Sequence, residues 1–134
     1  MKIYIAACFA QQAEVRIKAD ELKALGHECT SRWRYEPSTG GDGSEPEHAA
    51  HYADAALCDL EDVNSADTFV LLTSATSRSG GKHVETGYAL AREKRVIIVG
   101  RRAENVFHWL VAEHYESWDK FLEALCQQQP TNTR

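Results

Sequence analysis

The chain has 134 residues, a formal net charge of −5 and 43% hydrophobic residues. This length suits one domain with its own core. The acidic balance argues against a broad nucleic-acid surface, which would be basic, and no apolar run reaches the roughly 18 residues that a membrane helix needs. Neither a nucleic acid nor a membrane is therefore an expected partner.

The amino-terminal segment MKIYIAACFAQQAEV has the look of a short signal peptide. Its apolar stretch is brief and no convincing cleavage site follows, so a buried first strand is expected instead. The four cysteines, Cys8, Cys29, Cys58 and Cys126, are widely spaced and form no C-x-x-C pair. They predict neither a metal site nor a disulfide framework, and a cytoplasmic protein is expected.

Predicted strands and helices alternate along the chain. In order they are a strand over 2–9, a helix over 10–25, a strand over 27–33, a helix over 48–65, a strand over 67–73, a helix over 83–94, a strand over 95–100, a helical turn and a short strand within 104–117, and a helix over 118–128. Gly26 is placed to end the first helix. The Gly-, Ser- and Pro-rich segment over 36–48 predicts a mobile loop.

This alternation predicts an α/β domain over 1–128, followed by a flexible tail over 129–134. Strands and helices in this order form a parallel sheet with right-handed crossovers and helices on both faces. We expect a flavodoxin-like or Rossmann-like three-layer fold with about five strands. Ligands in such sheets bind beyond the carboxyl ends of the strands, so the loops over 73–82 and 101–105 should lie at the binding edge.

The segment SGGKHVETG, residues 79–87, places two glycines and a lysine before a predicted helix. It is not G-x-G-x-x-G, and a Walker A loop would need glycine at Thr76 and Ser or Thr at His83. The helix N-terminus still offers free N–H groups and partial positive charge. Glu85, in the predicted first turn, is expected to be ionised there. Acidic residues are also common in first turns for purely structural reasons, and Glu85 alone leaves that alternative open.

A second carboxylate strengthens the functional interpretation. The helix over 48–65 contains Asp54, Asp59, Glu61 and Asp62. At ~100° per residue, Asp59 falls at the edge of the apolar arc, whereas Asp54 and Asp62 point further toward solvent. Two carboxylates that converge on one pocket are suited to cleaving a glycosidic bond, since one attacks the anomeric carbon and the other orients the substrate or moves a proton.

Four segments together resemble the nucleoside 2-deoxyribosyltransferase-like family: KIYIAACF, DLEDVNSADTFVLL, SGGKHVETGYALA and NVFHW. They span most of the chain, and HVETGYALA is the most specific. The resemblance implies that Glu85 is a nucleophile that forms a glycosyl intermediate, that Asp59 is the second catalytic acid, and that Tyr4 orients Glu85. It also implies that Asn105 reaches into a neighbouring subunit's pocket, and hence at least a homodimer.

One position departs from the transferases of this family, which carry an aspartate where Ser79 stands. There the chain resembles the N-glycosidases that hydrolyse deoxynucleoside 5′-monophosphates, because a serine can donate to a phosphate that an aspartate would repel. Arg78, Lys82 or His83 could add positive charge. The other expected substrate-binding residues are Gly80, Gly81, His83, Cys8 and, matching a residue from the partner subunit, His108.

The resemblance implies cleavage of the N-glycosidic bond of (2′-deoxy)nucleosides or their 5′-monophosphates by a retaining double displacement. Water or a second base would resolve the intermediate, and no metal or organic cofactor is required. Among the tryptophans, Trp109 is the best candidate for a site role. Two alternatives stay open: a TIR-like NAD glycohydrolase, and a nucleotide-binding sensor that holds a ligand in the loop over 74–82 without turnover.

Overall fold

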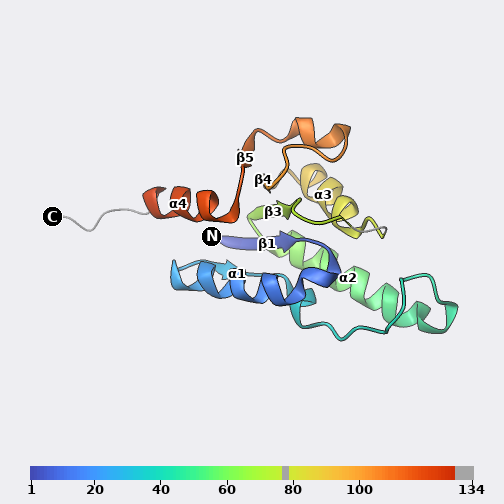
Figure 1. Cartoon of the computed structure of the whole chain (residues 1–134). Coiled ribbons are helices and arrows are strands. Elements are labelled where there is room, and N and C mark those ends of the chain that lie inside the picture. The colour runs from blue at the N-terminus through green and yellow to red at the C-terminus, as the bar shows by residue number, and fades with distance from the viewer. Residues whose placement is uncertain (77–78, 129–134) are drawn as a thin grey trace.

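The computed structural model describes residues 1–76 and 79–128, in which five parallel strands form one sheet in the order β2-β1-β3-β4-β5 (Figure 1). The strands are β1 Lys2–Ala6, β2 Glu28–Cys29, β3 Thr68–Leu72, β4 Arg95–Val99 and β5 Glu113–Tyr115. The α-helices are α1 Gln12–Ala24, α2 Ala49–Ser65, α3 Gly81–Ala91 and α4 Trp118–Gln128. Four 3₁₀ helices join them: η1 Phe9–Gln11, η2 Arg32–Tyr35, η3 Pro46–His48 and η4 Val106–Leu110.

The predicted α/β architecture is confirmed, and this strand order is that of the flavodoxin-like sheets. The expected tail over 129–134 lies outside the described residues. No helix in the described part of the chain combines the length and the apolar character that crossing a membrane requires.

The second strand is much shorter than the predicted range of 27–33. Ser31 ends it, because its hydroxyl accepts from the Ile5 N–H at 2.7 Å and donates to the Ile5 carbonyl at 3.1 Å. Trp33 Nε1 donates to the same carbonyl at 2.9 Å. Side chains thus occupy the edge of β1 where a longer strand would have paired, and the chain turns into η2 instead.

Helix α3 begins two residues earlier than predicted, at Gly81. The residue before it, Gly80, has φ +69°, a left-handed conformation that glycine adopts without steric cost. Its carbonyl accepts from the N–H groups of His83 and Val84 at 3.0 and 3.3 Å. This early start moves Glu85 from the first turn of the helix into the second.

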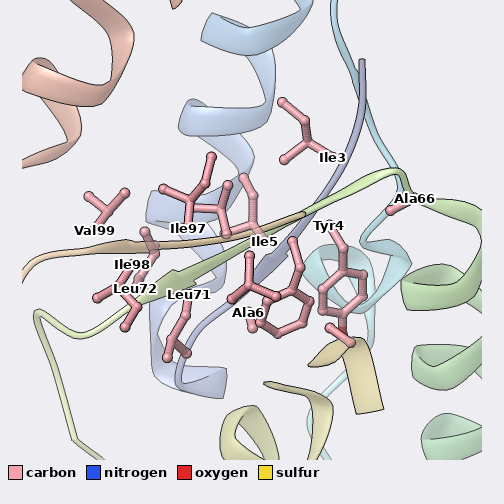
Figure 2. Packing of buried hydrophobic residues seen from close by; sticks show 14 of the residues in the cluster. Ile3, Tyr4, Ile5, Ala6, Ala66, Leu71, Leu72, Ile97, Ile98 and Val99 are labelled. Atoms are coloured by element: carbon pink, nitrogen blue, oxygen red, sulfur yellow. The ribbon is translucent and has the colours of Figure 1, made fainter. Parts of the chain in front are cut away.

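The helices cover the sheet on both faces. On one face, Trp118 of α4 donates to Glu21 of α1 at 3.2 Å. On the other, Arg92, the residue that caps α3, donates to Asn64 of α2 at 2.9 and 3.1 Å. Figure 2 shows the consequence for β1: Ile3 lies on the face covered by α1, and Tyr4 on the face toward α3.

The strand order reverses between β1 and β3, which opens the binding edge of a doubly wound sheet. Gly100 lets the carboxyl ends of β3 and β4 lie close together, because a Cβ at this position would lie 2.6 Å from Thr73 Oγ1. Thr73 Oγ1 also donates to the Arg101 carbonyl at 2.8 Å. The loops after β3 and β4 are therefore held together beside the start of α3.

Candidate active site

Asp59 of α2 and Glu85 of α3 converge on the same face of the sheet, where their carboxyl groups are close enough to shift each other's pKa. Two buried carboxyl groups at such close range disfavour the state in which both are ionised. Burial disfavours their charged forms, and nearby carboxylates add to this effect. The pKa of Glu85 rises to about 8 and that of Asp59 to about 6. The pair therefore retains one proton at neutral pH.

Tyr4 lies beside Glu85 and Asp59, on the sheet beneath them. It is fully buried in β1, and its ring stacks on Phe69 of β3 with 5.5 Å between centroids. Burial, and then the charge of Glu85, raises the pKa of the Tyr4 phenol well above its usual value. The hydroxyl has no hydrogen bond of ordinary geometry, although Glu85 is close enough to shift its pKa. The phenol is thus a neutral donor held beside Glu85.

Two expectations about these acids are wrong. Glu85 is not held ionised by the start of α3, since it lies in the second turn, where burial and Asp59 favour its neutral form. Asp62 does not face solvent: it is 5% exposed and accepts from the Arg32 N–H at 3.0 Å and from Arg32 Nε at 2.8 Å. Helical spacing places a side chain on a face, but it does not show that the segment after β2 covers that face.

A pocket of about 810 Å³ opens beside Asp59. Its walls come from η2, from α2 and from the loop that joins them, and Ser79 also lines it. Four of the lining side chains were not predicted as site residues: Phe9, Trp33, Glu36 and His51. The available signal was position, since the aromatic run RWRY ends directly at Glu36, where the Gly- and Ser-rich loop begins.

The loop over 36–48, predicted as mobile, is tied to α2. The Tyr52 hydroxyl donates to Glu45 at 2.7 Å and lies 3.0 Å from Thr39 Oγ1. Glu45 also accepts from the N–H groups of Asp42 and Gly43 at 2.9 and 3.2 Å. The hydrogen bond from Tyr52 and then that from Asp42 lower the pKa of Glu45. These hydrogen bonds hold the loop in place, and the loop forms a wall of the pocket.

A second cavity, of about 820 Å³, lies at the amino ends of the strands, and the residues that line it include Met1, Lys2, His27 and Asp67. Because ligands bind doubly wound sheets at the opposite edge, the pocket beside Asp59 is the better candidate. Across residues 1–76 and 79–128, no three His, Cys, Asp or Glu side chains are grouped as metal ligands would be.

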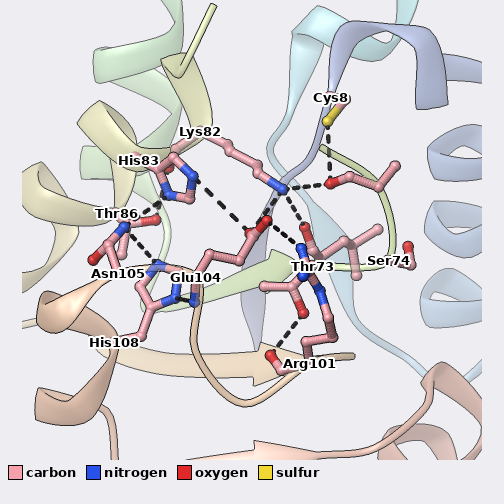
Figure 3. A network of polar contacts seen from close by, with 12 residues as sticks. Cys8, Thr73, Ser74, Lys82, His83, Thr86, Arg101, Glu104, Asn105 and His108 are labelled. Carbon is pink, nitrogen blue, oxygen red and sulfur yellow. Dashed lines mark hydrogen bonds and ion pairs between the residues drawn. The ribbon is translucent and has the colours of Figure 1, made fainter. Parts of the chain in front are cut away.

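The Lys82 ammonium is bonded to other groups of the chain (Figure 3). It is 4% exposed, donates to the carbonyls of Leu72 and Ala75 at 3.2 and 2.7 Å, and pairs with Glu104 at 3.0 Å. Cys8 is also buried, and its thiol donates to the same Ala75 carbonyl at 3.4 Å. Lys82 therefore ties the loops after β3 and β4 together rather than offering charge to a phosphate. Arg78 lies outside the described residues.

Asn105, His83 and His108 form a separate group. The Asn105 amide nitrogen lies 3.4 Å from His83 Nδ1 and 3.3 Å from His108 Nε2. His108 is 1% exposed and its Nδ1 accepts from the Glu104 N–H at 2.9 Å, so within its own chain it packs against the loop after β4. Positions 83 and 85 are about 200° apart around a helix, which places this group away from the carboxyl pair.

Trp109 does not line the pocket. It is 67% exposed on η4, with the Arg102 guanidinium 4.9 Å above its ring. Trp33, on η2, lines the pocket instead. In the sequence Trp33 is flanked by two arginines and Trp109 by His108 and Leu110, and neither pattern shows that the turn after β2 brings Trp33 to the pocket.

No protein-family model matches this sequence, and no curated protein matches it. Its fold is similar to that of a 2-deoxyribosyltransferase from Bacillus psychrosaccharolyticus, with a TM-score of 0.67 and 22% identity over 93% of this chain and 96% of that one. It is also similar to the CMP N-glycosidase BcmB from Clostridium botulinum, with a TM-score of 0.56 and 19% identity over 95% and 99% of the two chains.

The chain shares the fold of these two enzymes. A conserved protein from Enterococcus faecalis V583 shares it, with a TM-score of 0.62 and 19% identity over 96% of this chain and 99% of that one. The expected resemblance is thus confirmed at the level of fold. Within this fold, Tyr4, Asp59 and Glu85 are brought together, and Ser79 lines the pocket that Asp59 lines.

The raised pKa of Glu85 predicts that this residue destabilises the protein in alkali. The pKa of this carboxyl is higher in the folded than in the unfolded protein, so the folded state holds its proton to higher pH. The free energy of unfolding therefore falls as the pH rises from 4.5 through about 8. Glu85→Gln should remove that loss. The free energy of unfolding, measured in urea, should therefore fall less in the variant than in the wild type. Between pH 5 and pH 9 the difference should be at least about 1.4 kcal/mol, which corresponds to one pKa unit.

Glu116→Gln is the matched control, because Glu116 is exposed and distant in sequence from both helices. It should follow the wild type at both pH values. An equal pH dependence in Glu85→Gln and wild type would contradict the shared proton.

Proposed function

We propose that this protein cleaves the N-glycosidic bond of (2′-deoxy)nucleosides or their 5′-monophosphates. The observation that carries the proposal is the convergence of Tyr4, Asp59 and Glu85 beside a pocket of about 810 Å³. A pocket of this size accommodates a nucleotide. The fold is also that of a CMP N-glycosidase and a 2-deoxyribosyltransferase, which supports the same class of substrate.

In the proposed reaction, a Glu85 oxygen bonds to C1′ as the bond from C1′ to the base nitrogen breaks through an oxocarbenium-like state. Asp59 gives its proton to the departing base, and the Tyr4 hydroxyl donates to Glu85 to hold it in line. Water or a second base then attacks C1′. The proton of that acceptor returns to Asp59, and Glu85 leaves as a carboxylate.

This chemistry needs one proton on the carboxyl pair, carried by Asp59 at the moment of attack. The raised pKa values of both groups supply one proton at neutral pH. A base that accepts a hydrogen bond from Asp59 would draw the proton to that side and leave Glu85 ionised. The pair thus provides a nucleophile and an acid with a single shared proton.

The start of α3 is the proposed contact for the 5′ end of the substrate. Ser79 lines the pocket, and Gly80 and Gly81 bring the backbone N–H groups of the first turn beside it. These groups favour an oxyanion or a phosphate. Because Lys82 is neutralised by Glu104, recognition there depends on hydrogen bonds and the helix terminus more than on a free cation.

The proposal includes a homodimer in which Asn105 serves the neighbouring pocket. Asn105 does not line the pocket of its own chain. Apolar side chains around it are more than half exposed on α3 and η4, namely Val84, Val106, Phe107, Trp109 and Leu110. A patch of this kind marks an interaction surface. The four free cysteines fit the expected cytoplasmic location.

Loss of the nucleophile should abolish turnover. With a panel of nucleosides, 5′-monophosphates and NAD, with and without an acceptor base, chromatography should show base release by the wild type and at least about 10³-fold less by Glu85→Gln. Glu116→Gln should keep wild-type rates. Full cleavage by Glu85→Gln would refute the assignment, and release of nicotinamide alone would favour an NAD glycohydrolase.

A shared site predicts complementation between two inactive variants. If Asn105 serves the neighbouring pocket, Glu85→Gln and Asn105→Ala should each lose activity, while a mixed dimer contains one intact site. Random exchange should restore about a quarter of wild-type sites, since half of the dimers are mixed and half of their sites are intact. Activity that stays at the sum of the separate variants after subunit exchange would rule out this arrangement.

A further inference from the structure

Glu36 is a carboxylate held in place at one wall of the pocket. Its N–H donates to the Trp33 carbonyl at 3.0 Å, and its own carbonyl accepts from Gln12 Nε2 at 2.7 Å. The side chain pairs with His51 Nε2 at 3.3 Å. The backbone of Glu36 is therefore fixed, and His51 lies beside one carboxylate oxygen, Oε1. The other oxygen can accept a hydrogen bond from a ligand.

The position of Glu36 assigns it to the base side of the substrate. Glu36 and Asp59 both line this pocket, and the charge of Glu36 contributes to the raised pKa of Asp59. Asp59 is the acid that must face the departing base, so Glu36 lies on the same side of the bond that breaks. A carboxylate on the other side would repel a 5′-phosphate.

Two aromatic side chains line the same part of the molecule. Phe9 and Trp33 both line the pocket, with 6.4 Å between ring centroids, and Phe9 is 44% exposed. An exposed aromatic face accepts any nucleobase by stacking and does not read its edge. Stacking therefore supplies affinity at this site, and discrimination must come from a polar group such as Glu36.

We infer that Glu36 selects bases with an exocyclic amino group, the 4-aminopyrimidines and 6-aminopurines, over the corresponding oxo bases. This inference rests on the proposed function. An ionised carboxylate can only accept hydrogen bonds, which the amino group of cytosine or adenine donates. Uracil and hypoxanthine present a carbonyl oxygen at the same position, and its lone pairs would face those of Glu36.

Matched substrate pairs test the selection. We expect kcat/KM to be at least about tenfold higher for cytidine 5′-monophosphate than for uridine 5′-monophosphate. The same preference is expected for deoxyadenosine 5′-monophosphate over deoxyinosine 5′-monophosphate. Glu36→Gln should bring both ratios close to one, because an amide offers a donor as well as an acceptor. Glu47→Gln is the control: Glu47 is exposed, lies in the same region and does not line the pocket, so its ratios should stay at the wild-type values.

Equilibrium binding supplies a readout that needs no turnover. The Glu85→Gln protein should bind cytidine more tightly than uridine 5′-monophosphate, and adding Glu36→Gln should remove the difference. Unchanged ratios in Glu36→Gln, or a wild-type preference for oxo bases, would overturn the inference while leaving the proposed function intact. Absence of cleavage by the wild type of every nucleoside and 5′-monophosphate in the panel would overturn both.

Discussion

The buried carboxyl groups of Asp59 and Glu85 approach each other between helices α2 and α3, beside the buried phenol of Tyr4. The rest of the architecture serves to hold this contact. The three residues come from segments far apart in the chain, and a parallel sheet brings them to one face. Strand β3 is buried throughout its length, which provides a rigid support beneath them. The contact opposes folding, since each acid favours its neutral form, as is common where a site is built for chemistry.

Burial raises the pKa of Asp59 to about 6, and the charges of Asp62 and Glu36 add to this rise, whereas Glu85 and Arg32 oppose it. The pKa of Glu85 rises further, to about 8, so the proton of the pair rests on Glu85 until a base binds beside Asp59. Arg32 is also held by Asp62 through two hydrogen bonds, so much of its charge is already balanced. Glu36 would therefore have two effects: it accepts a hydrogen bond from the base, and its charge raises the pKa of the neighbouring acid, Asp59. Substrate binding on that side would complete the separation of roles between Asp59 and Glu85.

The elements that repeat regularly in the sequence were predictable, and the turns between them were not. Helices α2 and α4 and the run of parallel strands follow from hydrophobic spacing, and the motif HVETGYALA singled out Glu85. The shortening of β2 depends on the Ser31 hydroxyl bonding to Ile5, a contact between distant residues that no local pattern encodes. That turn is what places Trp33 and Glu36 in the pocket. In the same way, the burial of Lys82 depends on Glu104 from another loop.

The stereochemistry at C1′ tests the central claim most directly. Cleavage of a β-nucleoside in aqueous methanol would give a methyl glycoside whose anomeric configuration NMR can assign. A covalent intermediate on Glu85 requires two inversions, so the account predicts the β-anomer. Formation of the α-anomer would show a single displacement by the acceptor and would contradict the role given to Glu85.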